Sequence, residues 1–241
     1  MVTSGALVQA ADVPAGCSAP GTAVRNLLVT GPAGSRLARR LVDVSSGSCF
    51  DGTAGPGGEL WFVIAGAGQF VIAGQPGLPV SADLALRIPP GARYRLRADG
   101  PADLHIDAVT LPAAGAASAR SETAQAVARD LRDCPVETTG DRRFRVLFGP
   151  GRGCAVATQF VGEIPPGRAP EHSHPYDELV LILSGAGVLH TGGGAYPIRA
   201  GSCAHLPPGL RHCLENTGPA TLRVLGVFHP ADSPAAKNDP D

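Results

Sequence analysis

The chain has 241 residues, 17% of them charged, and a formal net charge of −1. This balance excludes the basic patch with which proteins bind nucleic acid or an anionic membrane, and no apolar run approaches the ~18 residues of a membrane span. The first residues lack the basic start and apolar core of a secretory signal, so we expect a cytoplasmic protein. Of the 20 basic residues only Lys237 is a lysine, which excludes a Schiff-base or phosphate-loop lysine in the folded part.

The chain contains 32 Gly and 23 Pro residues, about twice their combined share in an average protein. They lie between short runs rich in Val, Leu and Ile, such as ELVLIL, GVLHT and TLRVLGVF. This pattern predicts many short strands joined by tight turns, and therefore a sandwich or small barrel. The six cysteines are scattered without a CxxC pair, so we expect buried, reduced thiols and no cysteine-based zinc site.

Two segments of the chain are repeated in the same order. Residues 59–68, ELWFVIAGAG, resemble residues 178–187, ELVLILSGAG. Residues 88–104 resemble residues 206–222, because each segment contains Pro-Pro-Gly followed by an apolar run. Two ordered matches at a nearly constant offset predict two copies of one domain, and so two barrels.

We expect the first copy to lie in an N-terminal barrel, residues 1–110, and the second in a C-terminal barrel, residues 144–229. Residues 111–143 are then a linker. Within this linker Ser121 is a candidate N-cap, and residues 121–133 carry apolar side chains at helical spacing, which predicts a short helix. The polar residues 230–241 are expected to form a disordered tail.

The chemistry of the chain concentrates in the second copy, where six of the seven histidines follow residue 170. His172 and His174 are separated by one residue, so in an extended segment their side chains point to the same side. Glu178 starts the run ELVLIL, and His212 follows the PPGL turn. Three imidazoles and one carboxylate suit Fe, Mn, Ni, Cu or Zn and leave positions open on a six-coordinate ion.

These residues are arranged as in the two motifs of the cupin superfamily. The first motif, HxHxxxE followed by six residues and Gly, is found here from His172 to Gly185. The second motif, Gly-x5-PxG-x2-His-x3-Asn, is found from Gly201 to Asn216, and all its spacings match. The first motif departs slightly, because Gly167 lies one residue closer to His172 than in the common pattern.

The resemblance implies an all-β fold of two tandem cupin barrels, each a double-stranded β-helix or jelly roll, joined by the helical linker. It further implies one divalent transition metal per chain, in the C-terminal barrel. The ligands that it assigns are His172, His174, Glu178 and His212. The resemblance also gives Glu178 a catalytic role as a base toward the substrate, and it implies a homodimer.

The first copy resembles the same domain without its metal ligands. Alignment of Glu59 with Glu178 places Thr53 and Gly55 at the positions of the paired histidines and Tyr94 at the position of His212. One carboxylate cannot hold a transition metal alone, so we predict that the metal site of the N-terminal barrel is degenerate. This barrel is expected to be structural or to help dimerisation.

Several polar residues near the motifs have two interpretations. His190 and His205 lie in apolar strands, where an outer-wall or paired core histidine is favoured over one that lines the pocket. Tyr176 and Asp177 lie between the ligands, and each is either a contact of substrate or ligand, or a solvated loop residue. Cys203 and Cys213 are interpreted as buried thiols.

Three functions remain open. A metal-dependent oxygenase would bind a small chelating enol, phenol or carboxylate together with O2, as similar cupins do, and this is the function we favour. A non-oxidative isomerase, cyclase, decarboxylase or lyase would use the same ligands with the metal as a Lewis acid. A non-catalytic barrel would bind a small molecule. All three predict a small-molecule partner and neither nucleic acid nor membrane.

Overall fold

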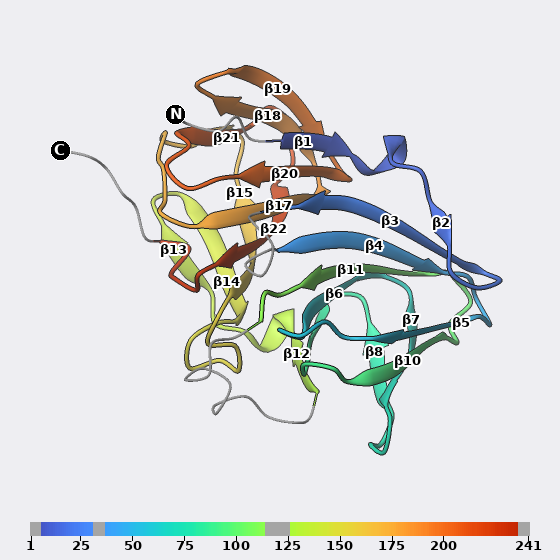
Figure 1. The fold of residues 1–241 in the computed structure, drawn as a ribbon. Coiled ribbons are helices and arrows are strands. Elements are labelled where there is room, and N and C mark those ends of the chain that lie inside the picture. Colours follow the sequence, from blue (N-terminus) through green and yellow to red (C-terminus); the bar gives the residue numbers. More distant parts are fainter. Residues whose placement is uncertain (1–5, 31–36, 114–125, 236–241) are drawn as a thin grey trace. The chain divides into compact units, whose positions relative to one another are not determined.

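The computed structural model describes residues 6–30, 37–113 and 126–235. The chain forms two compact units (Figure 1). The C-terminal unit consists of residues 1–12, 134–150 and 156–241, and the N-terminal unit of residues 13–133 and 151–155. Each unit contains a seven-stranded and a four-stranded antiparallel sheet, so the prediction of an all-β chain with two tandem barrels is confirmed. No helix of the described ranges is long and apolar enough to cross a bilayer.

In the C-terminal unit the two sheets enclose one apolar core, which takes residues from both. The larger sheet has the order β1 (Ala6–Gln9), β20 (Ser202–Leu206), β17 (Asp177–Ser184), β22 (Leu222–His229), β15 (Thr158–Ile164), β14 (Arg142–Phe148) and β13 (Glu137–Thr139). The smaller sheet has the order β16 (Gly167–Arg168), β21 (His212–Asn216), β18 (Ala186–Thr191) and β19 (Gly194–Arg199).

The N-terminal unit repeats this arrangement strand for strand. Its larger sheet has the order β12 (Val127–Asp130), β9 (Leu84–Ile88), β6 (Glu59–Ala65), β11 (Leu104–Thr110), β4 (Ala38–Val44), β3 (Thr22–Val29) and β2 (Gly16–Cys17). Its smaller sheet has the order β5 (Cys49–Thr53), β10 (Arg93–Ala98), β7 (Ala67–Ile72) and β8 (Leu78–Ser81). Alternation is clear in β10, where every second residue is buried and the intervening arginines face solvent.

The backbone conformation of a turn explains the glycine that ends the first motif. Gly185 joins β17 to β18 at φ +92°, and Gly66 joins β6 to β7 at φ +87°. A side chain at either position would be strained, because L residues rarely adopt positive φ. The same turn therefore recurs at the same place in both barrels.

The outermost strands of the two larger sheets come from the segments that precede each repeat. Strand β1 pairs with β20 in the C-terminal unit, whereas β12 pairs with β9 in the N-terminal unit. Each is followed by a single 3-10 turn, η1 (Ala10–Asp12) or η3 (Leu131–Asp133). Residues 6–12 therefore belong to the C-terminal unit although they begin the described chain, as the blue strand beside β20 in Figure 1 shows.

The prediction of a linker helix over residues 121–133 is wrong. Residues 121–125 lie outside the described residues, residues 127–130 form β12, and only the last three form a 3-10 turn. A helix here would leave the N–H and C=O groups at the edge of β9 without a backbone partner. Pairing with β9 satisfies both segments, and tertiary pairing therefore overrides the helical spacing of the apolar side chains.

The predicted tail is partly ordered, since the structure describes residues 230–235. The hydroxyl of Thr158 donates a hydrogen bond to the backbone oxygen of Asp232, 2.8 Å away. Residues 236–241 lie outside the described residues. Among the cysteines, Cys17 is exposed and Cys49 half-buried, against the expectation of burial. The remaining four, Cys134, Cys154, Cys203 and Cys213, are buried, and none of the six forms a disulfide.

Removal of residues 1–9 should destabilise the C-terminal unit, because β20 loses its partner strand and the core loses Leu7. We expect the free energy of unfolding of this unit to fall by about 2–4 kcal/mol. Hydrogen exchange should show faster exchange of the β20 amides. The β9 amides, whose partner β12 is retained, are the internal control, and unchanged protection of β20 would contradict the pairing.

Candidate metal centre

The four candidate ligands come from three segments of the C-terminal unit. His172 and His174 lie in the segment between β16 and β17, Glu178 is the second residue of β17, and His212 begins β21. His172 and His212 form an isolated antiparallel bridge, in which each backbone N–H donates to the carbonyl of the other residue, at 3.0 and 2.9 Å. The backbone thus holds two imidazoles from distant parts of the sequence side by side.

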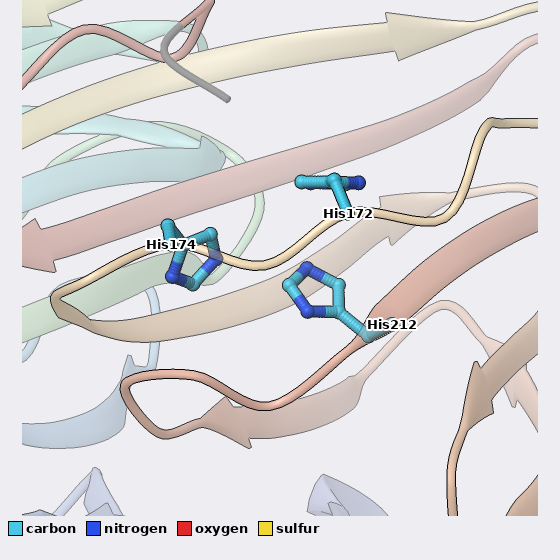
Figure 2. Close-up of side chains that lie close together, drawn as sticks. All are labelled: His172, His174 and His212. Atoms are coloured by element: carbon cyan, nitrogen blue, oxygen red, sulfur yellow. The ribbon is translucent and has the colours of Figure 1, made fainter. Parts of the chain in front are cut away.

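The three imidazoles converge, as Figure 2 shows. One ring nitrogen from each of His172, His174 and His212 lies within 4.8 Å of the others. The ring centroids of His172 and His212 are 4.5 Å apart, and those of His174 and His212 are 4.9 Å apart. His174 and His212 are buried and His172 is half-buried. Such a cluster has the spacing and donor type that a transition metal requires.

In each of the three imidazoles, Nδ1 forms a hydrogen bond with a backbone carbonyl. Nδ1 of His172 donates to the carbonyl of Pro170 at 3.1 Å, and Nδ1 of His212 donates to the carbonyl of Leu210 at 2.9 Å. Nδ1 of His174 donates to the carbonyl oxygen of Tyr176 at 3.2 Å. A carbonyl only accepts hydrogen bonds, so each Nδ1 carries the proton and each neutral ring presents an unprotonated Nε2. This is the second layer of contacts that orients histidine ligands in metal proteins.

Glu178 completes the cluster. Its carboxylate oxygen Oε2 lies 2.8 Å from Nε2 of His174, and both side chains are at least nine-tenths buried. Nε2 of His174 nevertheless has no hydrogen-bond partner of suitable geometry among the described residues. A buried nitrogen without a partner is costly unless something else coordinates it. The donor set therefore fits a divalent transition metal, and the assignment of the four ligands stays a prediction.

Burial and the carboxylate set the charge of the cluster. Desolvation lowers the pKa of His212 to about 4 and also lowers the pKa of His172. Desolvation acts in the same direction on His174, but the adjacent Glu178 outweighs it and raises the pKa of that imidazole. Burial alone would raise the pKa of Glu178, but the facing imidazoles hold it below its usual value. Near neutral pH the cluster therefore contains an ionised carboxylate and at least two neutral imidazoles.

Tyr176 is part of the site and is no solvated loop residue. Its ring stacks on His174, with centroids 4.3 Å apart and an interplanar angle of 9°. The other face of the ring stacks on Phe228, also at 4.3 Å. Because the Tyr176 carbonyl also accepts the Nδ1 proton, the residue holds His174 from two sides.

A cavity of about 90 Å³ adjoins the cluster. Most of its wall is apolar and comes from both sheets, with polar groups at the ligands and at the start of β14. It is lined by the four candidate ligands and by Thr139, Arg142, Arg143, Phe144, Phe160, Gly162, Glu163, Ile164, Tyr176, Val180, Leu206, Leu214, Val224, Phe228 and Pro234. The aromatic residues and Arg142 carried no motif signal, because strand facing cannot be assigned from one sequence.

The other histidines of this barrel do not join the cluster. His190 lies 2.7 Å from the carboxylate of Glu215, and His205 lies 2.7 Å from the carboxylate of Asp177. Neither histidine lines the cavity beside the ligands. Both are therefore paired histidines, which was the favoured interpretation. Asp177 is the partner of His205 and is not among the residues that line the cavity.

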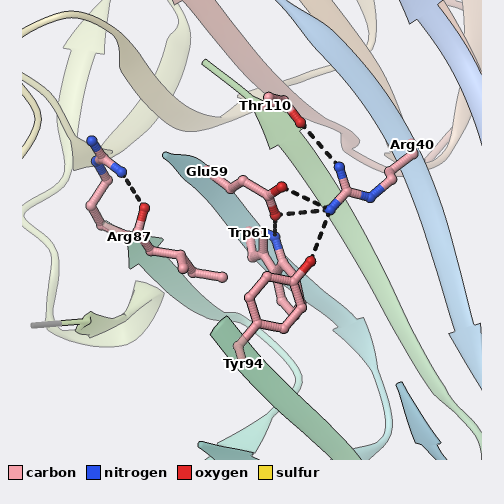
Figure 3. Close-up of polar contacts among 7 residues, drawn as sticks. Arg40, Glu59, Trp61, Arg87, Tyr94 and Thr110 are labelled. Carbon is pink, nitrogen blue, oxygen red and sulfur yellow. Dashed lines mark hydrogen bonds and ion pairs between the residues drawn. The ribbon is translucent and has the colours of Figure 1, made fainter. Parts of the chain in front are cut away.

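The N-terminal unit holds an arginine where the other unit gathers imidazoles (Figure 3). Nη2 of Arg40 donates to both carboxylate oxygens of Glu59, at 3.0 and 2.8 Å, and to the hydroxyl of Tyr94 at 3.2 Å. The indole N–H of Trp61 donates to the same carboxylate at 2.6 Å. The guanidinium supplies the positive charge that a metal would bring, and the network leaves Glu59 fully engaged.

The strand registers show which residue of the C-terminal unit corresponds to Arg40. Arg40 pairs with Ala108 on β11, and Phe160 pairs with Gly226 at the corresponding place on β22. The corresponding residue of the C-terminal unit is therefore a phenylalanine, which cannot neutralise a carboxylate. A Cβ at Gly226 would lie 2.1 Å from the ring of Phe160, so this glycine makes room for the ring that lines the cavity.

The interior of the N-terminal barrel is filled by aromatic rings. Trp61 packs edge-on against Tyr94 and Phe70, with centroids 4.8 and 5.5 Å apart, and Phe50 packs against Tyr94 at 6.2 Å. Desolvation in this interior raises the pKa of Tyr94 to about 12, with Glu59 adding to the effect. Tyr94 is thus a neutral core residue at the position of His212.

The comparison with known families matches the unit that contains the imidazole cluster. Residues 160–228 match the family described as the cupin domain, a match that spans both motifs and β15 to β22. Residues 160–228 are therefore a cupin domain. Over 68 residues the chain is 39% identical to the oxalate-binding protein of Thermotoga maritima, a stretch of 27% of the chain and 56% of that relative. The chain thus spans about half the length of this curated relative.

Solved structures share the fold over most of the chain. The protein YlbA from E. coli superposes with a TM-score of 0.76 at 16% identity, covering 95% of this chain and 92% of that one. Oxalate decarboxylase from Bacillus subtilis, studied for its Mn(II) centres, superposes with a TM-score of 0.74 at 13% identity. The match covers 94% of this chain and 78% of that chain. At these identities the likeness shows the fold alone.

Replacement of Arg40 by Met should destabilise the N-terminal unit, because the Glu59 carboxylate, 2% exposed, loses its guanidinium. We expect the free energy of unfolding to fall by about 3 kcal/mol. The double variant Arg40→Met/Glu59→Gln should recover most of this loss in urea unfolding. Arg95→Met, which breaks the exposed pair with Asp51, is the matched control and should have a much smaller effect, because solvent screens that pair. An equal effect of Arg40→Met and Arg95→Met would contradict the network.

Acid should destabilise the metal-free protein through His212. The unfolded chain protonates this residue near pH 6.5, whereas burial holds its folded pKa at about 4. Between these values the unfolded state binds the extra proton, so stability present above pH 6.5 is lost as the pH falls, by about 3 kcal/mol. Urea unfolding at pH 7 and 4.5 should show a smaller loss in His212→Asn than in wild type. Equal losses would rule out this cause.

Proposed function

We propose that the protein is a metal-dependent enzyme that acts on a small chelating carboxylate, enol or phenol in its C-terminal barrel. The observation that carries the proposal is the convergence of three imidazoles whose Nδ1 atoms are all occupied by backbone carbonyls, beside a buried carboxylate. His172, His174, Glu178 and His212 would hold the ion. A bound divalent transition metal would supply positive charge and open coordination positions for a chelating substrate.

The size of the cavity favours a compact substrate. The cavity of about 90 Å³ is small beside the ~300–1,000 Å³ of pockets that hold drug-sized ligands. Within the substrate classes of the sequence analysis, this favours small carboxylic acids and enols over polycyclic phenols. The similarity to the oxalate-binding protein of Thermotoga maritima supports the same size class.

The residues around the cluster have separable roles in this proposal. Glu178, ionised because the imidazoles lower its pKa, can accept a proton from a substrate bound beside it. Tyr176 and Phe228 form a stacked apolar wall that holds His174 in place and keeps water from that side. The apolar lining strengthens electrostatic contacts inside the cavity because it lowers the local dielectric constant.

Two reaction classes follow from this site. An oxygenase reaction, with O2 as the second substrate, is our first candidate, because the ligand set leaves positions open and the cavity wall is largely apolar. A non-oxidative decarboxylase or lyase reaction is the second, because the same four ligands would allow the ion to act as a Lewis acid. A homodimer stays part of the proposal as an expectation from the family resemblance.

Metal content tests the proposal first. After loading with Fe(II), Mn(II) or Zn(II), wild type should retain close to one ion per chain by elemental analysis. Glu178→Gln should lower metal affinity by at least about tenfold, because it removes the charged ligand. Glu59→Gln is the matched control in the other barrel and should leave metal content unchanged. Failure of wild type to retain any ion, or equal effects of the two variants, would contradict the assignment.

Turnover with and without O2 then separates the two reaction classes. The metal-loaded protein is given a panel of small carboxylic acids and diketones, and product formation and O2 uptake are recorded together. Products that require O2 support the oxygenase, and products formed equally well under nitrogen support the non-oxidative enzyme. Tight binding without any product would contradict both and leave a binding protein.

A further inference from the structure

Arg142 is a charged side chain of the cavity wall that no motif identifies. It is the first residue of β14, directly opposite Thr139 of β13, at the end of the hairpin that closes one side of the cavity. Arg142 lies on the same face of β14 as buried Phe144, because side chains two residues apart in a strand share a face. The neighbouring Arg143 also lines the cavity, but it lies on the opposite face of β14 and is exposed, so solvent screens its charge. Arg199 of β19 is likewise exposed and is not among the residues that line the cavity.

The guanidinium of Arg142 has no counter-ion. Its Nε is buried and has no hydrogen-bond partner, and no carboxylate of the described ranges forms an ion pair with this residue. The two acidic side chains of the cavity wall are engaged elsewhere. Glu163 pairs with Arg145, Nη1 to Oε1 at 3.4 Å, and Glu178 lies against His174.

An unpaired cation that lines a small, largely apolar cavity is costly for the fold. The planar guanidinium is suited to two parallel hydrogen bonds with a carboxylate, and Arg is always protonated, so it is a permanent anion site. With a divalent ion and one Glu carboxylate, Arg142 leaves the cavity two positive charges in excess. A substrate with two acidic groups would neutralise that excess.

We propose that Arg142 determines specificity by binding an acidic group of the substrate, and that the substrate is a compact dicarboxylate or an equivalent small dianion. The proposal rests on the proposed function for the chelation of the substrate and extends it to substrate charge. Arg142 contacts substrate in this scheme and takes no part in holding the metal. The small cavity limits the dianion to a few carbon atoms.

Isothermal titration calorimetry of the zinc-loaded protein tests the role of Arg142, with ligands matched in size. Oxalate is compared with oxamate, and malonate with malonamate, since each pair differs by one negative charge. Wild type should bind each dianion at least about tenfold more tightly than its monoamide. Arg142→Gln should lose this preference, Arg142→Lys should keep part of it, and Arg199→Gln, outside the cavity wall, should retain it in full. Metal content should be equal in all four proteins.

Thermal unfolding of the metal-free proteins gives a second readout that does not depend on the metal. Millimolar malonate should raise the Tm of wild type and Arg199→Gln by about 1–3 °C and leave the Tm of Arg142→Gln unchanged. Without ligand, Arg142→Gln should be at least as stable as wild type, because an unpaired cation is removed. If wild type retains no zinc, the proposed function fails, while this measurement still decides the role of Arg142.

Three results would overturn the proposal. The first is an unchanged preference for dianions in Arg142→Gln. The second is an equal loss in Arg199→Gln, which would indicate a general effect of surface charge. In the third, Arg142→Gln fails to fold, while Arg142→Lys folds but shows no preference for dianions. That result would mean that Arg142 stabilises the barrel and does not bind substrate.

Discussion

A carboxylate buried inside a β-barrel requires positive charge beside it, and both halves of this chain are arranged around that requirement. Glu59 and Glu178 occupy corresponding positions at the start of β6 and β17. In the N-terminal barrel the protein itself supplies this charge, because Arg40 reaches Glu59 from β4, which is separated from β6 by β11. In the C-terminal barrel Phe160 replaces that arginine, and three imidazoles face the carboxylate instead. The carboxylate of the N-terminal barrel is therefore already neutralised by an arginine, whereas the C-terminal barrel can accept an ion.

The imidazole cluster depends on ordinary backbone geometry more than on special side chains. Three carbonyls of nearby loop residues hold the Nδ1 atoms, and the bridge between His172 and His212 aligns the two segments. Tyr176 adds a stacked ring to the carbonyl that it already provides. The positions of the rings are thus set before any ion binds, so little conformational entropy has to be lost on binding.

The motif spacings predicted the fold and the cluster because both follow from short-range sequence patterns and from the repeat. The helix over residues 121–133 failed for the opposite reason, since strand pairing with β9 is a long-range effect. A signal was present: Asp12 and Pro14 recur as Asp133 and Pro135, which places β12 in the repeat of β1. Arg40, Phe160 and Arg142 could not be assigned, because their roles depend on which face of a strand is inward and on registers between strands distant in sequence.

The pairing of β1 with β20 has a consequence for the order in which the chain is made. Strand β1 leaves the ribosome first, yet its partner at residues 202–206 is synthesised about 195 residues later. At ~5–20 residues per second, the first strand waits roughly 10–40 s with its apolar side chain Leu7 uncovered. Strand β12, by contrast, follows β9 by only some forty residues and can pair while the second barrel is still being translated. The barrel that carries the candidate metal centre is therefore the last to be completed, and its completion depends on a segment from the opposite end of the chain.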